Sequence, residues 1–96
     1  MKHQVLNKDN TLTPVNVSYQ TKTIGYGRYE ILCYVRGIST PMSTVTNNSS
    51  LMDRYQDLLA EDMYQDAEEL LDKHFFKSDF EERITEYFGT LIQRVN

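Results

Sequence analysis

The chain has 96 residues, of which 40% are hydrophobic and 25% charged, and its formal net charge is −4. This composition is typical of a globular domain and argues against global disorder. The longest apolar run, Ile31–Val35, is too short to span a membrane, and the first ten residues lack the apolar core of a signal peptide. We therefore expect a cytoplasmic protein that forms a single domain over residues 1–96.

Residues 1–12 have the weakest structural signal, and we expect them to be the least ordered part of the domain. A first strand is predicted over residues 14–20, where three apolar side chains alternate with polar ones, namely Val15, Val17 and Tyr19. The sequence Gly25–Tyr26–Gly27 then predicts a turn, because glycine reaches positive φ without steric cost. A second turn is predicted at Arg36–Gly37.

A second strand is predicted over Arg28–Arg36. Its alternation places four side chains on one face: Tyr29, Ile31, Cys33 and Val35. Cys33, the single cysteine, is therefore expected to be buried and inert. A third strand over residues 39–46 contains Pro41, which cannot donate to a ladder and so favours a sheet edge. Three strands joined by short turns form an antiparallel meander, which needs a covering helix to be stable.

A long helix is predicted over Ser50–Phe76, preceded by several potential N-cap residues in Asn47–Ser50. One side carries an apolar stripe: Met52, Tyr55, Leu59, Met63, Leu70 and His74. Acidic residues gather opposite: Asp53, Asp57, Glu61, Glu68 and Asp72. Asp66 falls inside the apolar stripe, and an alternative is a break near residues 60–62 that gives two shorter helices.

A further helix is predicted to begin at Ser78, which forms a capping box with Glu81. Apolar residues recur behind it at helical spacing: Phe80, Ile84, Tyr87, Phe88, Leu91 and Val95. A short link at Lys77–Ser78 would fold the two helices back on each other. The predicted fold class is α+β, a three-stranded antiparallel meander followed by two antiparallel helices (β-β-β-α-α) in two layers.

No motif indicates catalysis. His3 lies in the weakly structured first segment, and His74 lies at the predicted end of a helix beside two phenylalanines, where a capping or packing role is expected. Asp62, Asp66 and Glu69 lack the loop carbonyls that usually complete a hard-cation site. We expect a non-enzymatic protein without a metal or a cofactor.

The charge is divided unevenly, with +3 over residues 1–50 and −7 over residues 51–96. Like charges spaced i, i+4 along a helix are destabilising, so either internal arginines (Arg28, Arg36 or Arg83) neutralise the acidic face or a basic partner binds it. The candidate partner-binding residues are Asp57, Glu61, Tyr64, Glu68 and Asp72. Tyr64 lies among the acids and is a candidate interface anchor, unless it packs against the second helix.

The primary hypothesis is therefore a protein–protein interaction module that binds a basic protein, such as one that handles nucleic acid. In size and charge the chain is similar to small acidic inhibitors carried by phages and other mobile elements, although no shared motif supports this similarity.

Two alternatives stay open. The first is a nucleic-acid-binding domain that uses a basic, tyrosine-rich hairpin: Lys22, Tyr26, Arg28, Tyr34 and Arg36. The overall acidity of the chain weighs against this reading. The second is a structural subunit that forms a homodimer through apolar helix surface.

Overall fold

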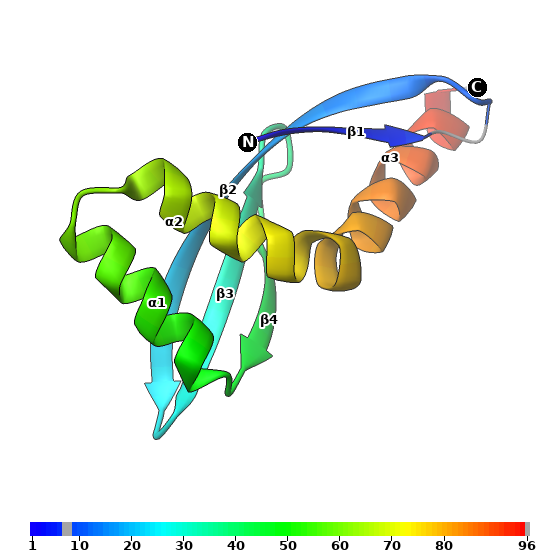
Figure 1. Cartoon of the computed structure of the whole chain (residues 1–96). Coiled ribbons are helices and arrows are strands. Elements are labelled where there is room, and N and C mark those ends of the chain that lie inside the picture. Colours follow the sequence, from blue (N-terminus) through cyan, green and yellow to red (C-terminus); the bar gives the residue numbers. More distant parts are fainter. Residues whose placement is uncertain (7–8, 96) are drawn as a thin grey trace.

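The computed structural model describes residues 1–6 and 9–95, with side chains described up to residue 88 in the last helix. Four strands are followed by a helical half (Figure 1). The strands are β1 (Lys2–Leu6), β2 (Leu12–Gly25), β3 (Arg28–Val35) and β4 (Met42–Thr46). The helices are α1 (Ser49–Ala60), α2 (Tyr64–Leu71), the π-helix η1 (Asp72–Phe80) and α3 (Glu81–Val95).

The sheet is an antiparallel meander of four strands in the order β1-β2-β3-β4, so the prediction of three strands is wrong. The additional strand is β1, in which only Val5 is fully buried. A short strand with one buried apolar side chain gives little periodic signal, which is why the sequence indicated it only weakly. The predicted antiparallel meander and its α+β class are confirmed.

Strand β2 is long and curved (Figure 1), and it belongs to two ladders. Its first part pairs with β1 in the register Lys2↔Asn16, and its second part pairs with β3 from Val17↔Val35 onward. The alternating side chains Val15, Val17 and Tyr19 are buried, as their spacing predicted. On β3 the buried face includes Ile31, Cys33 and Val35, which also matches the prediction.

The two predicted glycine turns are present. Gly27 and Gly37 adopt φ of 65° and 93°. A residue with a Cβ is strained at such positive φ, whereas glycine is not. Strand β4 follows Pro41 and lies at a sheet edge, as expected for a strand preceded by proline.

The predicted long helix is interrupted after α1, and the alternative of two shorter helices is confirmed. Asn48 caps α1 by accepting a hydrogen bond from the Leu51 N–H at 3.1 Å. At the other end Asp62 adopts φ of 61°, and the N–H groups of Asp62 and Met63 donate to the carbonyls of Leu59 and Leu58. This pair of hydrogen bonds is the Schellman motif, with aspartate at the left-handed position that glycine usually occupies.

The predicted link at Lys77–Ser78 is wrong, because η1 carries the chain from α2 into α3 without a break. Ser78 is not an N-cap, since its hydroxyl donates to the carbonyl of His74. The wider turn of a π-helix lets Phe75, Phe76 and Phe80 all reach the core. The continuation of the apolar stripe at Leu91 and Val95 lies outside the described side chains.

Helices α1 and α2 lie on one face of the sheet, so the fold has two layers there (Figure 1). The core between them includes Ile31, Met52, Leu71, Phe80 and Ile84, all fully buried. None of the helices within the described residues has the length and apolarity needed to cross a membrane.

Candidate functional site

The turn between α1 and α2 forms an exposed corner, which we call the acidic corner and define as Glu61, Asp62, Met63 and Tyr64. The side chains of Met63 and Tyr64 are 40% and 60% exposed, although both are large and largely apolar. Asp57, one helical turn earlier on α1, is also exposed. The corner therefore presents two large contact side chains surrounded by carboxylates.

Tyr64 is the first residue of α2, and its side chain is 60% exposed. Its hydroxyl donates to the Asp62 carboxylate at 2.9 Å, which fixes the ring beside the left-handed residue of the turn. A tyrosine held in this way loses little further conformational freedom when it binds a partner, because its rotamer is already restrained.

The acids of the corner are not neutralised by the arginines considered above. Among the described residues the one ion pair joins His3 to Asp72, away from the corner. Arg83 instead donates to the Ser43 carbonyl and lies over the Phe80 ring. Arg28 and Arg36 are exposed on and just after β3. The carboxylates of Asp57 and Glu61 therefore face solvent without an internal cation.

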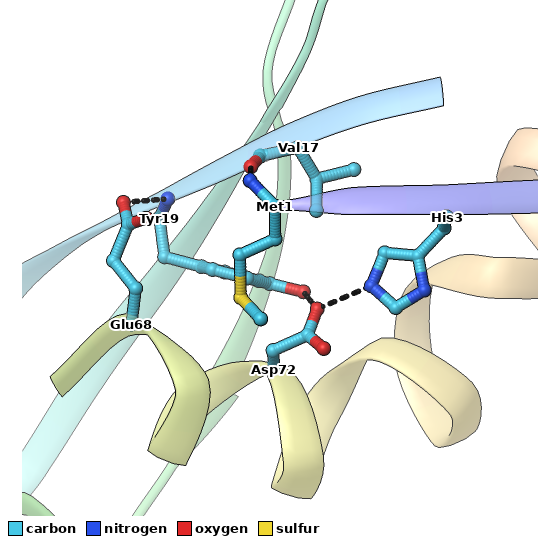
Figure 2. A network of polar contacts seen from close by, with 6 residues as sticks. All are labelled: Met1, His3, Val17, Tyr19, Glu68 and Asp72. Atoms are coloured by element: carbon cyan, nitrogen blue, oxygen red, sulfur yellow. Dashed lines mark hydrogen bonds and ion pairs between the residues drawn. The ribbon is translucent and has the colours of Figure 1, made fainter. Parts of the chain in front are cut away.

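The two remaining acids of the predicted face, Glu68 and Asp72, point toward the sheet (Figure 2). A Glu68 oxygen accepts the backbone N–H of Tyr19 at 3.2 Å. One oxygen of Asp72 accepts the Tyr19 hydroxyl at 2.6 Å and lies 2.7 Å from Nε2 of His3. The expectation of one continuous solvent-facing row from Asp57 to Asp72 is therefore wrong.

The physical reason is the left-handed Asp62, which resets the helical phase between α1 and α2. An angular projection that assumes one straight helix carries the phase of α1 into α2 and places Glu68 with Asp57. The same reset removes the flaw in the predicted apolar stripe, because Asp66 is exposed in the first turn of α2.

The inward carboxylates form a polar network that ties β1 and β2 to the helices. The His3 ring stacks on Phe76, with ring centroids 3.6 Å apart and planes 10° from parallel. Burial, together with the hydrogen bond to Asp72, raises the pKa of the Tyr19 hydroxyl, so it stays protonated as a donor. This network is structural, since its acids are already engaged.

A groove of about 690 Å³ opens between this network and the acidic corner. Its walls come from the start of β1, from β2, from α1 and from α2: Met1, Lys2, Tyr19, Tyr55, Leu59, Tyr64, Gln65, Glu68 and Glu69. Tyr64 thus belongs both to the acidic corner and to the groove, which makes the two features one continuous surface.

The residues of the nucleic-acid hypothesis lie elsewhere, on or near the sheet face opposite α1 and α2. Lys22, Arg28 and Tyr34 occupy strand positions whose side chains alternate with the buried ones. Tyr26 is fully exposed in the β2–β3 turn, and Arg36 is exposed just after β3. Glu30 pairs with Lys22 across the ladder and reduces the positive charge of this face.

Sequence reasoning did not assign His3 and Tyr19 to the polar network, or Gln65 to the groove. The signal that could have found the first two is period-two alternation, since His3 and Val5 alternate in β1 as Val17 and Tyr19 do in β2. Their contacts with Glu68 and Asp72 join residues 49 to 69 positions apart in the sequence and have no local signal.

Comparison of the chain with protein-family models, with curated proteins and with solved structures found no match. In the described part of the chain, no three side chains of His, Cys, Asp or Glu form a group that could hold a metal ion.

Proposed function

We propose that this protein is an interaction module that uses the acidic corner to bind a positively charged protein. The observation that carries the proposal is Tyr64, which is 60% exposed, held by Asp62 and flanked by unneutralised carboxylates. Exposed aromatic side chains are frequent energetic anchors of interfaces, and surrounding charges accelerate encounter with a partner of opposite sign.

The backbone of Asp62 gives further support. A non-glycine residue in the left-handed region costs about 1 kcal/mol, and glycine at this position would remove that cost. Aspartate provides what glycine cannot, a carboxylate that orients Tyr64. A conformation retained at the expense of stability beside an exposed aromatic residue supports a role in binding.

The proposed partner class is a basic protein, for example one that handles nucleic acid. The proposed biological setting is an accessory or inhibitor protein of a phage or another mobile element, acting in the cytoplasm. Size and charge support this setting, and the acidic corner supplies the surface.

The experiment that tests the proposal is affinity capture of a partner with the tagged chain, followed by binding measurements on variants. Tyr64→Ala and Glu61→Lys should each weaken the complex at least about tenfold, and their melting temperatures should stay near that of the unmodified chain because both side chains are exposed. Tyr26→Ala and Glu82→Lys make the same chemical changes at exposed sites away from the corner and should bind normally. Equal loss in the test and control variants would contradict the proposal.

A second candidate function is nucleic-acid binding by the sheet face opposite the helices. The observation that favours it is the position of Lys22, Arg28 and Tyr34 on one exposed face, with Tyr26 in the adjoining turn. Base stacking on tyrosine and phosphate contact by the cations would supply the affinity.

A further inference from the structure

The edge of β2 beside the groove is open. Strand β1 pairs with the first part of β2, and its last contact is the two-way hydrogen bonding between Met1 and Val17. Beyond Val17, no strand among the described residues pairs with this side of β2, whereas β3 pairs with the other side as far as Gly25.

The direction of each backbone group on this edge follows from the ladder. Val17 N–H and C=O point toward β1, and Asn16 C=O points toward β3, where it accepts the Arg36 N–H at 3.0 Å. Since these directions alternate along an antiparallel strand, the N–H and C=O groups of Tyr19, Thr21 and Thr23 point to the open edge. Such a row of backbone groups is a template for another strand.

Glu68 occupies the first of these groups, because its carboxylate accepts the Tyr19 N–H (Figure 2). A side chain cannot continue a ladder, so the outward backbone N–H and C=O groups of Thr21 and Thr23 have no ladder partner among the described residues. The groove reaches this edge at Tyr19, and Tyr64, Gln65 and Glu68 form part of its walls.

We propose that the β2 edge at Tyr19–Thr23 accepts an extended, basic segment of a partner protein as an additional strand. The inference rests on the proposed function and adds how the partner is bound. Backbone hydrogen bonds supply affinity, and contacts of the groove with side chains of the added strand supply specificity. Side chains of an added strand alternate between the two faces of the sheet, so every second one lies on the face that carries the groove, and the one nearest Tyr19 enters it.

The negative charge of the groove wall favours a basic strand. An added strand brings a carbonyl to the Tyr19 N–H and displaces Glu68, whose half-buried carboxylate then needs a new partner. A lysine or arginine on the strand supplies that partner, and Glu69 on the same wall adds a second negative charge. Lys2 also lines the groove and offsets part of this negative charge.

The variants that test this inference are Thr21→Pro and Thr21→Val. Both remove the threonine hydroxyl, but only proline removes the N–H that points to the open edge, and this N–H is not used by the β2–β3 ladder. The probe is a fluorescent decapeptide of alternating arginine and threonine. Thr21→Pro should bind it at least about tenfold more weakly than Thr21→Val does.

Two control peptides separate backbone pairing from charge. An alternating glutamate–threonine decapeptide should not bind. The arginine peptide with alternate backbone nitrogens methylated keeps its charge but cannot pair, and it should bind at least about tenfold more weakly. Equal binding of the methylated and unmethylated peptides would overturn the inference.

Hydrogen exchange in the unmodified chain keeps the test valid even where the proline variant fails to fold. Saturating arginine–threonine peptide should protect the Thr21 and Thr23 amides, while the Gln20 and Lys22 amides, already bonded to β3, should not change. Unchanged exchange at Thr21 and Thr23 would overturn the inference. Protection that grows with protein concentration without peptide would also overturn it, in favour of a second copy of the chain.

The outcomes distinguish this inference from the proposed function. Suppose that Thr21→Pro and Thr21→Val bind a captured partner equally well, whereas Tyr64→Ala loses binding. This result would contradict strand addition and support the proposed function of the acidic corner. Normal binding by both Tyr64→Ala and Glu61→Lys would instead remove the proposed function.

Discussion

The hydroxyl of Tyr19 on β2 donates to the carboxylate of Asp72 at the start of η1, with 2.6 Å between the two oxygens. This hydrogen bond joins the bend of the sheet to the π-helix and fixes where α2 lies above β2. The position of the groove and of the acidic corner depends on it, because both are built on the same helix.

Removing the Tyr19 hydroxyl should therefore destabilise the fold. We expect Tyr19→Phe to lower the free energy of unfolding by about 1.5 kcal/mol, since the hydrogen bond that is lost has a charged acceptor, the Asp72 carboxylate. Asp72→Ala should cost about 3 kcal/mol, because both the Tyr19 hydroxyl and the His3 ring then lack their partner. Urea denaturation measures the free energy of unfolding of both variants. Combining Tyr19→Phe with Asp72→Ala should lower it little more than Asp72→Ala does alone. Strict additivity would contradict a shared network.

The contact of His3 with Asp72 and Phe76 should hold β1 on the sheet. We expect His3→Ala to accelerate amide exchange throughout Lys2–Leu6, because the strand has one other buried anchor, Val5. Amides in α1 serve as the internal control and should exchange at the rate of the unmodified chain. Uniform acceleration over both elements would indicate global destabilisation instead.

The left-handed Asp62 should respond to glycine in a specific way. Asp62→Gly is expected to raise the free energy of unfolding by about 0.5–1 kcal/mol, since glycine has no Cβ to strain at positive φ. Asp62→Ala loses the same hydrogen bond to Tyr64 but keeps a Cβ, so it should be less stable than Asp62→Gly by about 1 kcal/mol. Under the proposed function both variants bind the partner more weakly, because Tyr64 is no longer held.

Alkaline pH should destabilise the chain through Cys33. Burial raises the pKa of this thiol from its ordinary value of 9.0 to about 12, so the folded state favours the neutral form. The unfolded chain loses the proton first, and the free energy of unfolding should fall from about pH 9 toward pH 12, by at most ~1.4 kcal/mol per pH unit for this group. The raised pKa of Tyr19 acts in the same direction.

Cys33→Ala is the matched variant for this pH dependence. It should be less stable at pH 7 because it leaves a small cavity, but its stability should fall less steeply above pH 9 than that of the unmodified chain. Urea unfolding at several pH values compares the two slopes, and equal slopes would show that the thiol does not contribute.

The second candidate function predicts a different pattern. Arg28→Glu and Tyr34→Ala should each abolish binding to a labelled single-stranded oligonucleotide at low salt, and Tyr64→Ala should not change it. Fluorescence anisotropy measures this binding. An unmodified chain that does not bind the oligonucleotide at low salt removes this candidate.

Local sequence patterns determined the parts of the fold that depend on neighbouring residues. Alternation predicted which faces of β2 and β3 are buried, glycine predicted both turns, and Pro41 predicted the edge position of β4. These features follow from backbone geometry and from the period of the side chains, so a single sequence is enough to find them.

Tertiary structure alone decided the phase of the helices and therefore the shape of the candidate site. The break depends on Asp62 in a conformation that aspartate adopts only rarely, and the passage through η1 depends on three phenylalanines that share one core. Neither has a strong local signal, because each becomes favourable only when the sheet lies beneath it. For the same reason the sequence shows how many acids residues 50–76 contain, but not where their side chains point. The packing of α2 and η1 on β2 directs Glu68 and Asp72 inward and leaves Glu61 and Tyr64 exposed.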